Sequence, residues 1–264
     1  MHMRTKKWAK PELAACPYYL DEPFECRGNW RSKFVKDQPL YVELGCGKGV
    51  STAQMVFDQQ DRNFVAVDIT SNVLGDARRN IEKLYGSQPV ENVILSRFDI
   101  SRFDEFFAGG DAVGRIYINF CNPWTKRPKY AKRRLTHTRQ LMQYRHALAD
   151  DGEIWFKTDD DTLFEESIPC FEESGFELIT VIRDLAVTDF KPNYISEHEQ
   201  MYRDMNVPIK FLVARMHPLD EAGQMRHDAV IEEVSRREKS ERQRKRAMTG
   251  DGSGNAEANG QEDK

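Results

Sequence analysis

The segment that most constrains the fold is residues 41–49, YVELGCGKG. A short run of strand-forming residues contains Glu43 and ends at Leu44, and three glycines then follow at alternate positions. This pattern predicts a buried strand that breaks into a tight loop, with a helix starting near Ser51. Glycines permit positive φ and close approach of a ligand, and the helix start offers free N–H groups. The segment therefore predicts an α/β fold with a loop for a nucleotide cofactor, the alternative being a turn that binds nothing.

The spacing of the glycines discriminates between cofactors. A dinucleotide fingerprint requires a third glycine where this chain has Val50, which disfavours NAD. A P-loop requires Gly-Lys-Ser/Thr, whereas Lys48 is followed by Gly49, which disfavours a phosphate-binding loop. The remaining pattern, E-x-G-x-G-x-G, resembles motif I of the S-adenosylmethionine-dependent methyltransferases. A carboxylate at Glu43 suits that ligand, which carries a sulfonium and an ammonium group.

Length and composition narrow the class of protein. The chain has 264 residues, of which 39% are hydrophobic, enough for one α/β domain with extensions. No apolar run is long enough for a membrane helix and the N-terminus lacks a signal-peptide core, so we expect a cytoplasmic protein. Five scattered cysteines and six histidines show no metal-ligand spacing, which predicts free thiols and no bound metal. The oligomeric state stays open between monomer and homodimer.

Three of the first four predicted strands end in a carboxylate. These strands span residues 40–44, 63–68, 93–99 and 114–120, with helices over 51–59 and 71–85. Ligands of open α/β sheets lie beyond the carboxyl ends of the strands, so we expect Glu43, Asp68 and Asp99 to converge on one cleft. There Asp68 suits the ribose hydroxyls and Asp99 the adenine amino group. A helix N-cap is a further role open to Asp68.

The charges are segregated, although the net charge is only −4. Residues 124–149 carry eight lysines and arginines and no acidic residue, and a smaller basic patch over residues 4–10 includes Trp8. Such segments can neutralise RNA phosphates while acidic residues elsewhere keep the chain anionic. A merely solvated helix face is the alternative.

A family resemblance begins where the fourth strand ends. Residues 119–126, NFCNPWTK, and 132–136, KRRLT, closely resemble the N-F-x-D-P-W-P-K and K-R-R-L-T signature of bacterial tRNA (guanine-N7)-methyltransferases. Residues 152–159, GEIWFKTD, resemble the family's fifth strand, and 196–199, SEHE, its T-x-Y/F-E motif. The resemblance covers roughly residues 40–216, with four motifs in the right order.

The resemblance implies a fold and a division of the chain. The fold is the Rossmann-like class I methyltransferase fold, an α/β architecture with a seven-stranded, mostly parallel sheet, helices on both faces and an antiparallel last strand. The expected parts are an irregular N-terminal arm (1–38), an S-adenosylmethionine-dependent methyltransferase domain (39–216), and a polar helix with a disordered tail (217–264).

The implied activity is methyl transfer from S-adenosylmethionine to N7 of the variable-loop guanosine of tRNA. The implied cofactor site consists of Glu43, Gly45, Gly47, Asp68, Asp99 and Asn122. The implied contacts to RNA or guanine are Lys126, Asp159, Ser196 and Glu199. A carboxylate at Asp159 can accept from both N1–H and the N2 amino group of guanine. Capping the next helix is the alternative role of Asp159.

One departure from the family pattern concerns the reaction itself. Asn122 stands where the family has the aspartate regarded as catalytic. Guanine N7 carries a lone pair and no proton, so the reaction needs alignment more than a base, and we expect an amide to suffice. Two alternatives remain open, an RNA-binding relative that has lost catalysis and a methyltransferase with another substrate.

Overall fold

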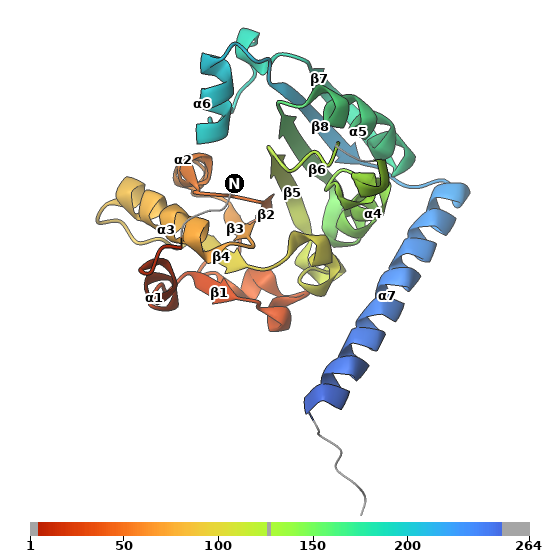
Figure 1. Ribbon diagram of the computed structural model, residues 1–264, viewed down its shortest axis with the longest axis horizontal. Helices are drawn as coiled ribbons and strands as arrows, with labels where there is room; N and C mark the ends of the chain where they lie inside the picture. The colour runs from red at the N-terminus through yellow and green to blue at the C-terminus, as the bar shows by residue number, and fades with distance from the viewer. Residues whose placement is uncertain (1–4, 126–127, 250–264) are drawn as a thin grey trace, which may run out of the picture.

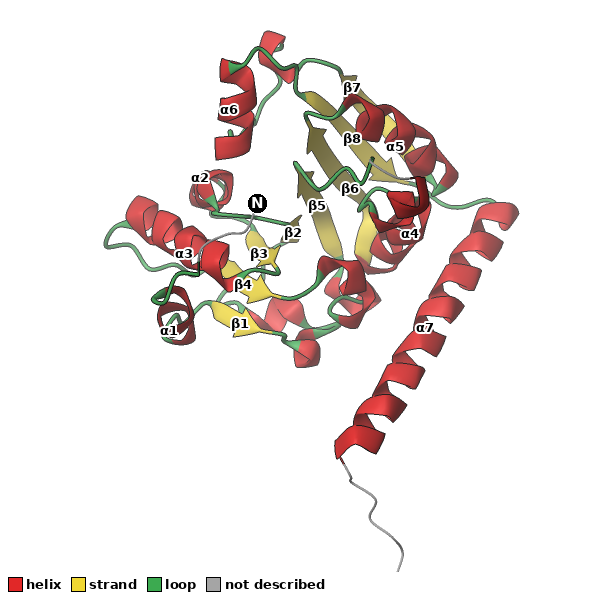
Figure 2. Cartoon of the chain, viewed as in Figure 1, coloured by secondary structure: helices red, strands yellow, loops and turns green. Residues whose placement is uncertain are grey.

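The computed structural model of the protein describes residues 5–125 and 128–249. Within them, eight strands form one sheet with helices on both faces (Figures 1 and 2). The strands are β1 (Tyr19–Asp21), β2 (Leu40–Leu44), β3 (Asn63–Asp68), β4 (Val93–Arg97), β5 (Val113–Asn119), β6 (Leu148–Thr158), β7 (Phe176–Ile182) and β8 (Lys210–Met216). The helices are α1 (Ala9–Ala14), α2 (Val50–Asp58), α3 (Ser71–Tyr85), α4 (Thr138–Ala147), α5 (Asp161–Glu173), α6 (Glu197–Asp204) and α7 (Glu221–Thr249).

The strand order is β1-β4-β3-β2-β5-β6-β8-β7. Every neighbouring pair from β1 to β6 is parallel, whereas β8 runs antiparallel to both β6 and β7. The predicted Rossmann-like fold with an antiparallel last strand is confirmed. The one difference is the eighth strand, β1, which pairs with β4.

β1 belongs to the N-terminal arm, which is more regular than expected. The arm contains α1 as well as β1, and it docks on α3. The Arg79 guanidinium lies 3.4 Å from the centre of the Trp8 ring and pairs with Glu12, while Lys6 pairs with Asp76. Part of the N-terminal basic patch is therefore engaged in holding the arm on the domain.

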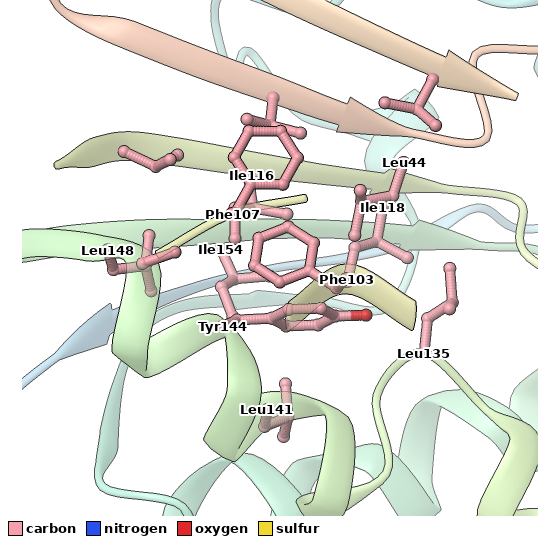
Figure 3. Close-up of a cluster of buried hydrophobic side chains, with 14 of the residues drawn as sticks. Leu44, Phe103, Phe107, Ile116, Ile118, Leu135, Leu141, Tyr144, Leu148 and Ile154 are labelled. Atoms are coloured by element: carbon pink, nitrogen blue, oxygen red, sulfur yellow. The ribbon is translucent and has the colours of Figure 1, made fainter. Parts of the chain in front are cut away.

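The core on one face of the sheet combines aromatic and aliphatic side chains, as Figure 3 shows. Phe103 and Phe107 stack with their centroids 4.7 Å apart, and Tyr144 of α4 meets Phe103 edge-on at 4.8 Å. They pack against β5 and β6 residues such as Ile118 and Ile154, all fully buried. Because helices cover both faces of the sheet, its accessible polar side chains lie mainly at the ends of the strands.

The C-terminal segment after β8 forms one long helix, α7. In Figure 1 its C-terminal half extends away from the sheet, and Arg139 of α4 pairs with Glu233 at 3.4 Å. The predicted polar helix is thus present, and residues 250–264, where the disordered tail is expected, lie outside the described residues.

Gly49, at the start of α2, is a position where a side chain does not fit. Its φ is +67°, and a Cβ there would lie 2.6 Å from the Cβ of Ala77 in α3. Gly47 has a similar φ of +56° but no atom within 4 Å of its Cβ position. We expect Gly47→Ala to lower the free energy of unfolding by about 1 kcal/mol through backbone strain alone. Gly49→Ala should lower it by roughly 1–3 kcal/mol more, because it also overpacks the helix contact.

Urea unfolding of both variants without cofactor measures this difference. If the free energy of unfolding fell equally in the two variants, the close packing of α2 on α3 would be contradicted.

Candidate active site

The predicted cofactor residues lie at one edge of the sheet. Glu43 is in β2, and Asp68 ends the neighbouring parallel strand β3. Asp99, Asn122 and Asp159 follow the ends of β4, β5 and β6, which are parallel to them. Carboxyl ends of parallel strands share one edge, so the fold brings these five side chains to the same end of the sheet, which the sequence predicted for Glu43, Asp68 and Asp99.

Glu43 is almost completely buried, with 2% of its surface exposed. The Thr52 hydroxyl donates to its Oε2 at 2.5 Å and the Asn119 amide to its Oε1 at 3.1 Å. Burial raises the pKa of Glu43, and the two donors act against this rise by stabilising the carboxylate. Neither donor was expected from the sequence, although Asn119 is the first residue of the N-F motif.

Asp68 joins the end of β3 to the glycine loop. Its Oδ2 accepts from the Gly47 N–H at 3.2 Å and its Oδ1 from the Thr70 N–H at 2.9 Å. Burial raises the pKa of Asp68, and these backbone donors lower it. Gly45 and Gly47 have positive φ, and no atom lies within 4 Å of a Cβ at either position. The loop therefore presents bare backbone to an open space.

That space is a cleft of about 1250 Å³, part of it open to solvent. One wall is the glycine loop with the start of α2, and the other is the first turn of α6. Glu43 and Asn119 lie at its end towards the sheet. The lining residues are Glu43, Gly45, Cys46, Gly47, Lys48, Gly49, Val50, Ser51, Val73, Asn119, Phe120, Ser196, Glu197 and His198. Of the predicted site residues, Glu43, Gly45, Gly47 and Ser196 line this cleft.

Asp99 lies two residues beyond the end of β4. It is half-buried, and its Oδ1 accepts from the Ser101 N–H at 2.9 Å, which caps a short 3₁₀ helix (Ile100–Glu105). The predicted contact of Asp99 with adenine stays a prediction.

Asn122 lies in an exposed loop after β5. Its Oδ1 accepts from the Trp124 N–H at 3.1 Å, which closes a tight turn. Phe120 and Trp124 on either side have φ of +50° and +48°, a left-handed conformation that is unusual for bulky residues. An aspartate could accept the same hydrogen bond, so this turn is compatible with either residue.

Asp159 and its neighbour Asp160 have different roles. Asp160 caps α5, since its Oδ1 accepts from the Leu163 N–H at 2.7 Å. Tyr202 of α6 lies near the Asp159 carboxylate, and burial followed by this carboxylate raises the pKa of Tyr202. The cap suggested as an alternative role for Asp159 is thus provided by Asp160, and Asp159 stays half-buried beside α6.

Ser196 and Glu199 both hold α6 in this structure. The Ser196 hydroxyl caps the helix by accepting from the Glu199 N–H at 3.1 Å. Glu199 is fully buried and pairs with Lys157 of β6 and Arg203 of α6, each at 2.7 Å. Burial lowers the pKa of Lys157, and Glu199 opposes this change. The predicted contacts of Ser196 and Glu199 with guanine stay predictions, and Lys126 lies outside the described residues.

The basic residues of 124–149 whose exposure the structure describes include two kinds. Arg134 is 8% exposed, donates to the Pro123 carbonyl at 2.8 Å and pairs with Glu166. Lys132 and Arg133 are exposed, and the Arg133 guanidinium lies 5.1 Å from the centre of the Trp124 ring. Only the second kind is available to a large partner.

Comparisons with known proteins agree with this geometry. A family model described as "Putative methyltransferase" matches residues 37–212. A tRNA (guanine-N(7)-)-methyltransferase of Clostridium botulinum is 48% identical over 216 residues, covering 81% of this chain and 98% of that protein. A protein of the same name from Ruminiclostridium cellulolyticum is 47% identical, covering 81% and 92%.

Solved structures support the fold alone. An antibiotic-related methyltransferase superposes with a TM-score of 0.50 at 14% identity, covering 83% of this chain and 97% of its own. The 16S rRNA methyltransferase KamB gives 0.50 at 10% identity, covering 82% and 96%. No helix within residues 5–125 and 128–249 is long and apolar enough to cross a membrane.

Proposed function

Since the chain belongs to the tRNA (guanine-N7)-methyltransferase family, we propose that its cleft binds S-adenosylmethionine and that its substrate is the variable-loop guanosine of tRNA. The observation that carries the proposal is the cleft itself, where a buried carboxylate and two glycines without Cβ atoms face one open space. With tRNA as substrate, we expect the protein to work in the cytoplasm.

The residues of the cleft fit this cofactor. Glu43 presents a buried carboxylate, held by Thr52 and Asn119, to a ligand that carries positive charge. Asp68 lies next to the loop with acceptor oxygens suited to ribose hydroxyls, and Asp99 follows the adjacent strand. S-adenosylmethionine, when bound, supplies an electrophilic methyl group on its sulfonium.

The protein's part in the transfer is alignment. Guanine N7 already has its lone pair, so no side chain has to remove a proton. We propose that Asp159 holds the base by accepting from N1–H and the N2 amino group, and that Ser196 at the start of α6 also contacts it. The Asn122 amide orients cofactor or base by hydrogen bonds, and lacks only the charge with which an aspartate would stabilise the cationic product.

The RNA-binding part of the proposal depends on two exposed residues, Lys132 and Arg133, the second of which lies over the Trp124 ring. Reversing both charges (Lys132→Glu with Arg133→Glu) should raise the KM for tRNA by about 10- to 100-fold. The slope of log KM against the logarithm of the salt concentration should also become smaller by about two. Cofactor affinity should not change, because neither side chain lines the cleft.

The matched control is the same double reversal at Lys33 and Lys36. Both are exposed, and they precede β2, so they lie towards the opposite edge of the sheet. If the Lys132/Arg133 variant behaved like this control, RNA would not bind at this surface, and a methyltransferase with a small substrate would be favoured.

Asn122 motivates one further candidate, an RNA-binding relative with impaired catalysis. Calorimetry with S-adenosylmethionine and a single-turnover assay distinguish an active enzyme from such a relative. An active enzyme binds the cofactor and transfers the methyl group, whereas an impaired relative binds tRNA without turnover.

A further inference from the structure

Helix α6 contacts both the glycine loop and the segment that follows β5. Its Glu197 pairs with Lys48 of the glycine loop at 2.8 Å. Its His198 and Tyr202 rings lie 5.9 and 6.5 Å from the ring of Phe120, two residues before Asn122. In Figure 1 the helix lies beside α2 at the end of the sheet where the cleft opens.

The same helix contributes directly to the site. Its N-cap Ser196 lines the cleft, and its Tyr202 lies near enough to Asp159, the proposed guanine ligand, for that carboxylate to raise the pKa of Tyr202. A small shift of α6 would therefore change the cofactor cleft, the loop of Asn122 and the position of Asp159 together.

One buried carboxylate fixes this helix to the sheet. Glu199 has no exposed surface, and its Oε2 accepts from Lys157 of β6 at 2.7 Å. Its Oε1 accepts from Arg203 at 2.7 and 3.0 Å and from the Asn193 amide at 3.3 Å. Both oxygens are thus occupied by donors from β6, α6 and the segment before α6.

Lys157 connects this carboxylate with the cofactor end of the site. Its ammonium group also donates to Asn193 Oδ1 at 2.7 Å and to the Tyr194 carbonyl at 3.3 Å. Lys157 and Glu43 line the same small cavity behind the cleft, and the Glu43 charge acts on Lys157. An electrostatic interaction thus links Glu43 with Lys157, and an ion pair links Lys157 with Glu199 and so with α6.

A direct contact between Glu199 and a guanine would disrupt this arrangement. The carboxylate would have to leave Lys157, whose side chain is 8% exposed, without its charged partner. Removing one member of a buried ion pair is strongly unfavourable, because the other charge stays desolvated.

We propose that Glu199 is a positioning residue: paired with Lys157 and Arg203, it docks α6 so that the cofactor cleft and the guanine site keep their geometry, and it does not touch the base. The proposal deepens the proposed function and rests on it for the guanine site. Its effect on the cleft can be measured without RNA.

The test uses Glu199→Gln, Lys157→Met and the double variant, with Asp204→Asn on the exposed side of α6 as control. The readouts are calorimetric affinity for S-adenosylmethionine without RNA, amide hydrogen exchange of residues 196–204, and KM and kcat with tRNA. Each single variant should weaken cofactor binding roughly 3- to 30-fold and speed exchange in α6. The double variant should be little worse than either single one, because both changes remove the same contact. Asp204→Asn should behave like the wild type.

One combination of results would contradict the docking role of Glu199. If Glu199→Gln leaves cofactor affinity and exchange as in the wild type while raising KM or lowering kcat with tRNA, Glu199 contacts the substrate and the proposal is wrong. If Glu199→Gln does not fold, Arg203→Met decides, since Arg203 is only partly buried. Loss of cofactor affinity in that variant supports the docking role, and unchanged affinity overturns it. If tRNA is not the substrate, only the turnover assay will fail, and the cofactor affinity and amide exchange will still test the docking role.

Discussion

Replacing Asp159 with asparagine is expected to lower kcat/KM for tRNA by about 10³- to 10⁴-fold, because a site built to hydrogen-bond a group discriminates strongly when the pairing is lost. The two carboxylate oxygens can accept from N1–H and the N2 amino group of guanine. The asparagine amide would instead place its NH2 group against N1–H or the N2 amino group, and two donors cannot hydrogen-bond each other. Affinity for S-adenosylmethionine should stay the same, because Asp159 does not line the cofactor cleft.

Asp160→Asn is the matched control for this prediction. The neighbouring residue undergoes the same chemical change, and asparagine is as good a helix cap as aspartate, so the N-cap of α5 is kept. Steady-state kinetics with one tRNA transcript compare the two variants. Similar activities of Asp159→Asn and Asp160→Asn would show that Asp159 does not bind guanine.

The second large effect concerns Asn122. We expect Asn122→Ala to lower kcat by roughly 100-fold or more, because it removes a group that orients the reactants and the acceptor that holds the Trp124 N–H. Asn122→Asp keeps that acceptor and adds a charge beside the developing cation. Its activity should lie within about two orders of magnitude of the native activity. Single-turnover rates under saturating cofactor measure both effects.

The contrary outcome for Asn122 is equally clear. No turnover by the native protein together with robust turnover by Asn122→Asp would show that an aspartate is obligatory, and would favour the impaired relative.

The regular elements of the domain could be predicted because their patterns are local. β3 and α3 have the predicted bounds, residues 63–68 and 71–85, since each has an apolar periodicity and a clear end signal. β1 has only three residues, and its place at the sheet edge depends on pairing with β4, which no local pattern encodes. The docking of α1 likewise depends on contacts between segments about 70 residues apart, such as Lys6 with Asp76.

The site was predictable to the extent that topology alone places it. Strand order brings Glu43, Asp68 and Asp99 to one edge whatever the side-chain conformations are. Burial and pairing are tertiary properties, so the sequence could not show that Arg134 is a structural residue and Arg133 an exposed one. A sequence motif also does not distinguish a residue that binds the substrate from one that holds the site in place, which is why the burial of Glu199 was unexpected.

The most direct test of the account is to incubate the purified protein with an unmodified tRNA transcript and methyl-labelled S-adenosylmethionine, followed by nucleoside analysis. The account predicts labelled 7-methylguanosine, which disappears when the variable-loop guanosine is replaced by another nucleotide. Label in a different nucleoside, or no label on tRNA although the protein binds the cofactor, would contradict it.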